Sequence, residues 1–509
     1  MKLADFSPAS RATLYFMCNV GFSLLVMLAA ATGPDGNPRI PYLCLLMAVC
    51  SLPILWMREL NGRYVLLTAF LAAYLFFYGA ADFSALLAER TTTNSRGILS
   101  AAELTVLAGG LLTVLGYRLG LLTRGTRAAA RPAHDYPPRL VLAAGLVLWT
   151  LGTLGVWIWQ VKIQTNAVTM SKEYGSFTLL AAVIARMLQP LGMIMLAYAW
   201  VANRSRWLLL LLAGLVCIEV FVGFVGDSKE TAMRGVIILI MAVFLLQGRV
   251  SRVWLSVLVA FAVLAYPVFQ AYRAEVMHMR GISRADAASD VLHSLKLALG
   301  ARGKMDRKFS SDYNAPDFIG RTSLKPTIEL LIAKTGDAAP FQHGYTLWLY
   351  FTGFVPRFIW PDKPDSSVGQ LMNRQFRVSE DPDTYISATH LGELYWNFGY
   401  AGVALGMLCL GAMLGFINAR CDLSERRSLT RLLVLVTTVY AAIVRFEGSI
   451  ALEYIVFTRS LALIWIMHLL FARQPAAGRA AGSETGSQAG GEAAYPPPRP
   501  LIHAPQLMR

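Results

Sequence analysis

Apolar runs long enough to form membrane-spanning helices recur along the chain and constrain its fold more than any other feature. A helix of about 20 apolar residues crosses a hydrocarbon layer roughly 30 Å thick. Composition agrees with this, since 56% of the 509 residues are hydrophobic and only 15% are charged, whereas a soluble domain carries about 25% charged residues. The sequence therefore predicts an all-α polytopic membrane protein.

About twelve runs are long enough to span the membrane. The first is longer than the apolar core of a signal peptide and lacks a convincing small-residue cleavage site, so we interpret it as a helix. The expected spans are residues 12–31, 39–57, 64–88, 98–121, 140–161, 177–201, 207–226, 231–247, 253–272, 391–416, 431–447 and 451–472. Residues 1–272 would then hold helices 1–9, and residues 391–472 would hold helices 10–12.

Basic residues alternate between the loops that join these spans and so predict the orientation of the chain. The short loops on one side are rich in arginine, and the positive-inside rule places that side in the cytoplasm. These arginines are Arg58, Arg63, Arg124, Arg127, Arg131, Arg139, Arg204, Arg206, Arg249, Arg252, Arg420, Arg426, Arg427 and Arg473. Both termini are then cytoplasmic, and the Gly-, Ala- and Pro-rich residues 473–509 are expected to form a disordered cytoplasmic tail.

The same distribution argues against a nucleic acid as partner, although the formal net charge is +15. Much of the excess lies in short loops between spans, and no soluble domain interleaves basic with aromatic residues. Five of the six cysteines fall in expected spans, which predicts neither disulfides nor a metal cluster.

One long segment, residues 273–390, is left outside the membrane between the ninth and tenth spans. A connection of that length in a compact protein is usually functional or disordered, and its many aromatic residues lead us to expect an ordered one. The segment is rich in positive charge, which outside loops normally avoid. Two interpretations stay open: salt bridges on a solvated surface, or a site for an anion such as pyrophosphate, which arginine binds in bidentate fashion.

Within this segment, "FVPRFIWPDKPDSSVGQ" (residues 354–370) interrupts an apolar stretch with prolines and basic residues. Pro356 and Pro361 stop the helix and fix the backbone, while aromatic rings such as Trp360 favour the headgroup level. Arg357 and Lys363 would then lie at the depth of the lipid phosphates, either as interfacial anchors or as ligands of an anion. The preceding stretch reads as a half-helix or an interfacial helix.

Three stretches together resemble bacterial O-antigen polymerases, the Wzy-type oligosaccharide repeat-unit polymerases. They are "GRTSLKPTIELLIAKTGDAAPFQHGYTLW", "VPRFIWPDKPDSSVG" and "SATHLGELYWNFGYAGVALGMLCLG". The most specific part is a P-R-x-x-W-P-x-K-P turn that precedes a G-E-x-Y-x-N-F-G helix start. The resemblance covers residues 320–415 and elsewhere amounts to a polytopic profile.

The resemblance implies a membrane glycosyltransferase of the GT-C type in the bacterial inner membrane, with a large periplasmic loop. Such an enzyme transfers a growing glycan from one undecaprenyl pyrophosphate carrier to a repeat unit on another, for O-antigen, capsule or exopolysaccharide. It implies no cofactor and no metal ion. The expected partners are the undecaprenyl-pyrophosphate-linked oligosaccharide, membrane lipid and a chain-length regulator protein.

This chemistry requires cations that neutralise the departing pyrophosphate and a base for the acceptor hydroxyl. We expect catalytic roles for Arg357, Glu393 and His390, the last two on one helix face. A helix-start role for Glu393 is the alternative, and Glu447 and Glu453 are further carboxylate candidates. The expected substrate-binding residues are Arg273, Arg280, Arg321, Lys325, Lys363, Arg374, Tyr395, Asn397 and Arg445.

Arg445 and Arg459 fall inside expected spans, where a charge is costly and marks a functional candidate. For Arg445 the alternative is an ion pair with Glu453, which we place at a similar depth. Asp381 and Asp383 have a spacing that metal-dependent transferases use, but a polar turn is the preferred interpretation, and we expect no metal site.

Two other functions stay open. A ligase that moves the glycan to lipid A core or to protein would need the same pyrophosphate site, so the cell's product has to separate it from a polymerase. A lipid-linked oligosaccharide flippase or other transporter usually shows paired repeats and broken helices at mid-membrane. We find no convincing internal repeat, and the polar residues gather outside the membrane.

Overall fold

A computed structural model describes residues 21, 39–56, 65–87, 99–123, 136–159, 176–225, 229–247, 323–365, 367–380, 384–421 and 428–472. Over these ranges the chain is almost entirely helical and has no β-strand beyond an isolated bridge between Thr335 and Ala339. The all-α class is therefore confirmed. The expected spans 12–31 (apart from Gly21) and 253–272, and the tail 473–509, lie outside the described residues.

Each expected span that falls within the described residues is matched by a helix. The helices are α2 (Arg39–Trp56), α3 (Val65–Leu87), α4 (Ala101–Leu122), α5 (Pro138–Trp157), α7 (Ser176–Asn203), α8 (Arg206–Val225), α9 (Lys229–Gln247), α17 (His390–Arg420), α18 (Leu429–Thr438) with the π-helix η4 (Val439–Val444), and α19 (Ile450–Ala472). Eight of them are long and apolar enough to cross a membrane, whereas α2 and the α18–η4 run are shorter. The chain is a membrane protein; a total of about twelve spans stays a prediction.

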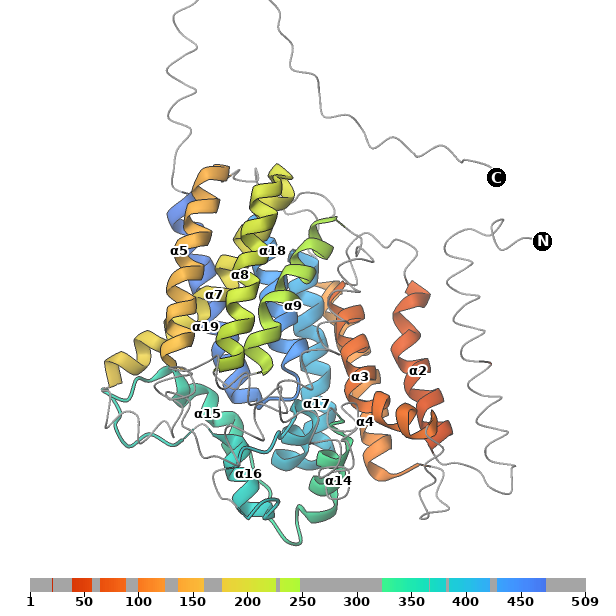
Figure 1. Cartoon of the computed structure of the whole chain (residues 1–509). Helices are drawn as coiled ribbons and strands as arrows, with labels where there is room; N and C mark the ends of the chain where they lie inside the picture. The colour runs from red at the N-terminus through yellow and green to blue at the C-terminus, as the bar shows by residue number, and fades with distance from the viewer. Residues whose placement is uncertain are drawn as a thin grey trace, which may run out of the picture.

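Three short helices, α14 (Lys325–Lys334), α15 (Tyr345–Phe354) and α16 (Val368–Phe376), gather at one end of the bundle of long helices (Figure 1). With ten residues, α15 rises about 15 Å, half the thickness of a hydrocarbon layer. Backbone hydrogen bonds attach this segment to the bundle, from Leu324 to Phe77 at 3.0 Å and from Thr389 to Glu447 at 3.1 Å.

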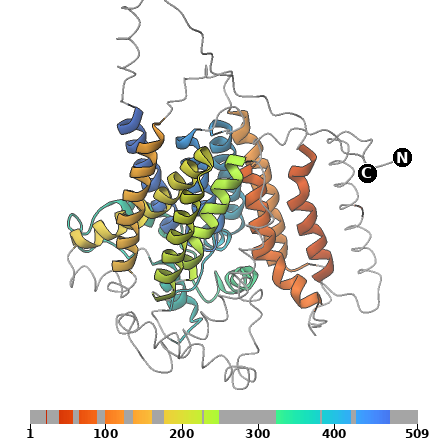
Figure 2. The ribbon, with the colours of Figure 1, turned by 45° about the horizontal axis from the view of Figure 1, so that its top comes forward.

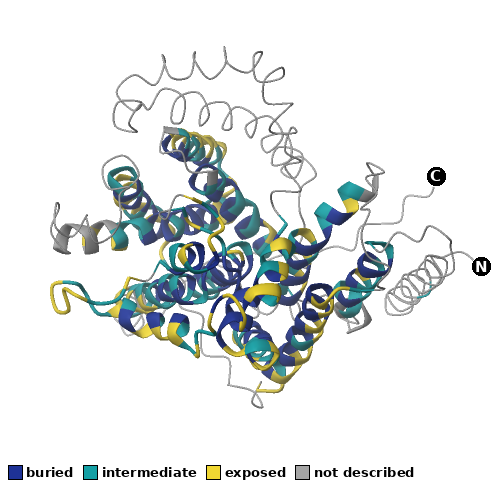
Figure 3. Ribbon diagram, turned by 90° about the horizontal axis from the view of Figure 1, so that it is seen from below, coloured by how far each residue is buried: buried dark blue, intermediate teal, exposed yellow. Residues whose placement is uncertain are grey.

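The buried apolar residues form two clusters. One joins α2, α3, α4 and α17 to the short helices, and the other joins α5, α7, α8, α9 and α18. The long helices lie side by side in both views of the ribbon (Figures 1 and 2). Seen along the bundle, buried residues face the helix neighbours while exposed residues lie toward the outside (Figure 3), as expected when lipid surrounds the helices.

Helices α4 and α17 approach each other so closely that only glycine fits between them. Gly116 and Gly120 on α4, and Gly411 and Gly415 on α17, form two G-x-x-x-G patterns. A Cβ atom built on Gly116 would overlap the carbonyl group of Leu408, and those built on the other three would also overlap facing backbone. Small residues of this kind allow membrane helices to associate by close backbone packing.

Replacing Gly411 by valine should therefore push α17 away from α4. Overpacking a filled interface costs about 1–3 kcal/mol of folding free energy, so the midpoint of thermal unfolding in detergent should fall. Gly214 on α8 is the matched control, because nothing lies within 4 Å of a Cβ built there. Equal shifts for Gly411→Val and Gly214→Val would contradict a filled α4–α17 interface.

Helix α7 carries Pro190 in its interior. Because proline has no backbone N–H, the carbonyl group of Arg186 one turn earlier loses its intrahelical partner, and helices commonly bend at such a point. Farther along the helix, Gly192 fits closely against the backbone of Trp149 on α5. The backbone hydrogen bonding of α7 is thus interrupted at the carbonyl group of Arg186.

Candidate functional site

A cavity of about 320 Å³ lies between the membrane helices and the residues that follow α15. We call it the cationic cavity, because six basic side chains line it. Asp365 is the one acidic side chain in the part of the lining that the structure describes. The basic residues are Arg186, Arg234, Arg357, Lys363, Arg445 and Arg459.

Arg445, which follows η4, is balanced by two carboxylates. Its Nε lies 2.9 Å from Oε2 of Glu453, and its Nη1 lies 3.2 Å from Oε1 of Glu230. The hydroxyl of Tyr440 donates to the same Glu230 oxygen at 2.6 Å. The ion pair between Arg445 and Glu453, expected from the sequence as the alternative to a ligand role, is confirmed.

Arg459 and Lys363 bind the C-terminal carbonyl groups of α15. Arg459 Nη2 donates to the carbonyl of Gly353 at 2.7 Å, and Lys363 Nζ donates to that of Val355 at 2.7 Å. The last carbonyl groups of a helix lack intrahelical partners and carry partial negative charge. The two cations therefore stabilise the end of α15 at the edge of the cavity.

Arg357 closes the turn after α15. Its Nη1 donates to the carbonyl groups of Pro361 and Lys363, at 3.1 and 3.3 Å. These acceptors, like those of Lys363 and Arg459, are neutral. Because hydrogen bonds between ionised groups are roughly twice as strong as neutral ones, an anion in the cavity would compete for these donors.

Arg186 and Arg234 lie inside candidate spans on α7 and α9. Arg234 is only 3% exposed; its Nη2 donates to Oε1 of Gln189, whose Nε2 donates to Thr153 on α5 at 3.1 Å. The guanidinium carbon of Arg186 lies 5.7 Å from the ring centroid of Trp159, within the range of a cation–π contact. Within the described residues neither arginine forms an ion pair.

The wall of the cavity combines basic and apolar side chains. On α7 the lining runs from Val183 through Arg186 to apolar side chains that end at Ile194, and on α9 Arg234 is followed by Ile238. The α18–η4 run has the opposite direction and reaches Arg445 last. Helices α7 and α9 begin at the end of the bundle where the short helices lie (Figure 1). Arg186, Arg234 and Arg445 thus lie nearer that end than the apolar side chains that continue from them, whereas on α19 Leu452 and Ile455 precede Arg459.

Three of the residues that the sequence assigns to the site, Arg357, Lys363 and Arg445, line the cavity. Glu393 and His390 do not, and both lie in the core with 0% and 1% exposure. Glu393 Oε2 accepts a hydrogen bond at 2.7 Å from the backbone N–H of Ile450, the first residue of α19. Glu393 therefore does serve a helix N-terminus, but that of α19 as well as its own.

His390 is surrounded by aromatic rings. Its ring centroid lies 4.8 Å from that of Phe446 and 5.6 Å from that of Tyr454. Neither ring nitrogen has a hydrogen-bond partner within the part of the chain that the structure describes. This position gives His390 no contact with the cavity.

Tyr395 and Asn397 attach the short helices to α17. Asn397 Nδ2 donates to Thr346 Oγ1 at 2.7 Å, and its Oδ1 accepts from the backbone N–H of Gly344 at 2.9 Å. Tyr395 packs against Phe341 with 6.3 Å between ring centroids. Asn397 thus holds the first turn of α15, and Tyr395 packs against a residue that precedes it. Both side chains lie outside the cavity lining.

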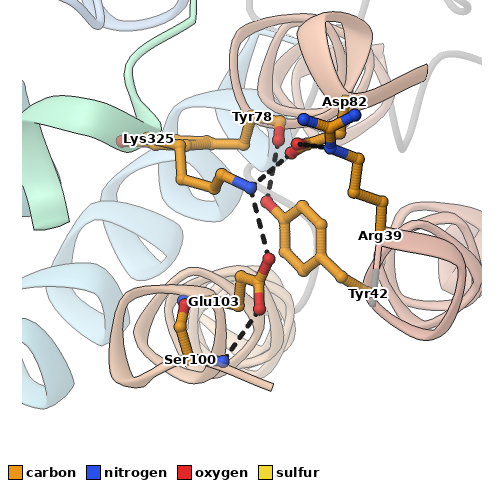
Figure 4. A network of polar contacts seen from close by, with 7 residues as sticks. All are labelled: Arg39, Tyr42, Tyr78, Asp82, Ser100, Glu103 and Lys325. Atoms are coloured by element: carbon orange, nitrogen blue, oxygen red, sulfur yellow. Dashed lines mark hydrogen bonds and ion pairs between the residues drawn. The ribbon is translucent and has the colours of Figure 1, made fainter. Parts of the chain in front are cut away.

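Lys325, expected to bind substrate, instead joins α14 to α3 and α4 (Figure 4). Its Nζ lies 2.6 Å from Asp82 Oδ2 and 3.2 Å from Glu103 Oε1, and Arg39 Nε lies 3.6 Å from the other Asp82 oxygen. The ammonium group also lies 5.0 Å from the ring centroid of Tyr42. The sequence could not indicate these ion pairs, because the partners come from helices more than 200 positions earlier in the chain; a substrate-binding role for Lys325 stays a prediction.

Lys325→Met should destabilise the fold and leave the cavity unchanged. The side chains of Lys325, Asp82 and Glu103 are at most 14% exposed, and removing one partner of a buried ion pair costs about 3–5 kcal/mol. Thermal unfolding in detergent measures this loss. Lys334→Met, on the exposed face of the same helix, is the matched control. Lost activity at unchanged stability would restore Lys325 as a substrate ligand.

The remaining expected residues lie elsewhere. Arg374 is exposed on α16 and outside the cavity lining. Outside the described residues are Arg273, Arg280, Arg321, Asp381 and Asp383. The described part of the chain contains no group of three or more His, Cys, Asp or Glu side chains suited to a metal ion.

Sequence reasoning missed Arg186 and Arg234. The signal was present, because each is a basic residue inside an otherwise apolar span, and such residues mark functional candidates. Arg459 met the same criterion and does line the cavity.

Comparison with known proteins identifies a family. A family model described as a domain of unknown function, DUF8712, matches residues 153–469, which is more than half of the chain. No curated protein and no solved structure matches. The matched region contains all six basic residues of the cationic cavity, whereas α2, α3 and α4 precede it.

Proposed function

We propose that this chain, which belongs to the family described as domain of unknown function DUF8712, is a membrane glycosyltransferase. It polymerises undecaprenyl-pyrophosphate-linked oligosaccharide repeat units at the periplasmic face of the bacterial inner membrane, for O-antigen, capsule or exopolysaccharide. A GT-C-like arrangement of about twelve spans, cytoplasmic termini and a chain-length regulator protein as partner belong to the same proposal.

The cationic cavity is the observation that carries this proposal. Six basic side chains line it, and on α7 and α9 apolar side chains continue from Arg186 and Arg234 into the bundle. A lipid-linked pyrophosphate has the same two parts, an anionic head and an apolar chain. Guanidinium groups suit phosphate oxygens because their planar fork binds in bidentate fashion.

The reaction breaks the bond between the anomeric carbon of the growing glycan and its pyrophosphate oxygen, and joins that carbon to an acceptor hydroxyl oxygen. Negative charge develops on the departing pyrophosphate, and fixed cations in the cavity stabilise it without requiring a metal ion. The acceptor hydroxyl must lose its proton. Asp365 is the carboxylate that the described lining offers for this step, whereas Glu393 and His390 lie outside that lining.

A ligase that uses the same donor would need the same cavity. The two activities differ in what accumulates when the protein is lost. Loss of a ligase leaves full-length polymer on the lipid carrier, while loss of a polymerase leaves single repeat units. Gel analysis of the cell's glycans after deletion separates them, and accumulated lipid-linked polymer would contradict the polymerase proposal.

Arg357 tests the role of the cations in catalysis. Arg357→Ala removes a charge and opens the turn that its Nη1 closes, so we expect the rate to fall about a hundredfold, equivalent to about 3 kcal/mol. Arg357→Lys keeps the charge but loses the planar fork, and we expect a smaller loss. The measurement is polymer formed from lipid-linked repeat units by purified protein, with EDTA present.

Arg377→Asn is the control for both variants. Arg377 is exposed and lies at the C-terminus of α16 with φ of 50°, a backbone conformation that asparagine tolerates. Its activity should equal that of the wild type. If both Arg357 variants form as much polymer as the wild type, Arg357 serves only as an interfacial anchor.

Anion binding should also weaken as the pH rises through about 8. Burial lowers the pKa of Lys363 to about 8, and the positive charges of Arg357 and Arg459 act in the same direction, whereas an ordinary lysine keeps its proton to about pH 10. The ammonium form is therefore present below pH 8 and lost above it. Titrating the protein with farnesyl pyrophosphate at pH 7 and pH 9 measures the effect. Lys363→Arg should remove this pH dependence, and an unchanged profile would exclude Lys363 as its cause.

A further inference from the structure

We propose that Arg186 and Arg234 form a distinct anion subsite inside the membrane-spanning part of the bundle, and that its ligand is a phosphate group at the head of a lipid. The identity of that lipid as a polyprenyl pyrophosphate rests on the proposed function. The subsite itself rests on the geometry of α7 and α9, and both residues lie within candidate spans, whereas Arg357 and Lys363 lie in the turn after α15.

Arg234 has a donor to spare. Its side chain is 3% exposed and lines the cavity, and its Nη2 donates to Gln189. Its Nε is buried and has no hydrogen-bond partner within the part of the chain that the structure describes. An unpaired donor on a buried charged group is unfavourable, and an acceptor in the cavity would satisfy it.

Arg186 faces the same cavity from α7. Its guanidinium group contacts the ring of Trp159 and interacts electrostatically with Glu230. Pro190 on the same helix cannot donate to the backbone carbonyl of Arg186. Two guanidinium groups from neighbouring helices thus lie at one cavity, and at least one of them offers a free N–H group.

Nearby carboxylates do not cancel these charges. Glu230 interacts electrostatically with Arg186, Arg234 and Arg445, but its hydrogen-bond-length contact is to Arg445. Glu219 interacts electrostatically with Arg234 and accepts a hydrogen bond from Trp149. Neither carboxylate lines the cavity. Within the described lining six basic side chains face one acidic side chain, Asp365, so positive charge remains for a ligand.

Arg186 and Arg234 differ from the other cations of the cavity in the groups that they already bind. Arg357, Lys363 and Arg459 donate to backbone carbonyl groups, and Arg445 is paired with two carboxylates. Arg234 differs in that its Nε is buried with no hydrogen-bond partner within the described residues, so an anion that reaches it satisfies a donor that water does not reach.

The surroundings select a lipid rather than a free anion. Beyond Arg186, the side chains of Met187, Leu191 and Ile194 line the cavity toward the interior of the bundle, and beyond Arg234 comes Ile238. A hydrocarbon chain attached to the phosphate would cover this wall and add apolar burial to the affinity.

The test uses the full-length chain in nanodiscs of phosphatidylcholine, titrated with farnesyl pyrophosphate, with inorganic pyrophosphate and with phosphatidylglycerol. Farnesyl pyrophosphate should bind, and Arg186→Gln and Arg234→Gln should each weaken it by about tenfold or more, equivalent to about 1.4 kcal/mol. Arg118→Gln is the matched control, because Arg118 lies in the span α4 and outside the cavity lining; its affinity should equal that of the wild type.

Wild-type affinity in both glutamine variants would overturn the subsite. Inorganic pyrophosphate that binds as tightly as farnesyl pyrophosphate would overturn the lipid part of the proposal. Displacement of farnesyl pyrophosphate by phosphatidylglycerol at equal concentration would support the subsite and assign it to a phospholipid headgroup.

Two safeguards keep the outcomes separate. If the glutamine variants fail to fold, Arg186→Lys and Arg234→Lys carry the test: they keep the charge, lose the fork, and should still weaken binding. Polymer formation by the wild type tests the proposed function on its own. Binding at Arg186 and Arg234 without polymer formation would remove the function and leave the subsite standing, whereas polymer formation with unaffected variants would do the reverse.

Discussion

A guanidinium group inside a bundle of membrane helices needs a polar or aromatic partner. The four arginines that the helices contribute to the cationic cavity each have a different one. Arg445 is balanced by the carboxylates of Glu453 and Glu230, and Arg459 by the carbonyl group at the end of α15. Arg234 donates to the buried side-chain amide of Gln189, and Arg186 contacts the indole ring of Trp159. Because the partners come from different helices, satisfying the charges also fixes how those helices meet.

The turn after α15 belongs to the same balance. Proline at 356 prevents the helix from continuing, which leaves its last carbonyl groups without partners inside the membrane protein. Lys363 and Arg459 supply those partners. Phe358 and Trp360 are exposed beside them, at 58% and 40%, as suits rings at a membrane surface. Prolines, cations and aromatic rings therefore occur together in residues 354–370. The prolines end the helix, the cations bind its last carbonyl groups, and the rings lie at the membrane surface.

Helix positions could be predicted because length and hydropathy are local properties of a span. The ion pair of Arg445 with Glu453 was also accessible, since a tight turn brings the two to one depth. Lys325 and Glu393 could not be placed, because Asp82 in one case and the start of α19 in the other come from distant sequence. Arg186 escaped notice for a different reason: a single basic residue hardly changes the mean hydropathy of its span.

The π-helical turn η4 sets which residues at the end of the α18–η4 run lie on the same face. A π-turn accommodates one residue more than an α-turn, so the segment Val439–Val444 holds an inserted residue without breaking the rod. The backbone N–H of Arg445 donates to the carbonyl of Tyr440, five positions earlier, at 3.1 Å, and both side chains contact Glu230. In an unbroken α-helix, residues five positions apart point about 140° away from each other. The wider turn is therefore what lets one carboxylate serve both the tyrosine and the arginine.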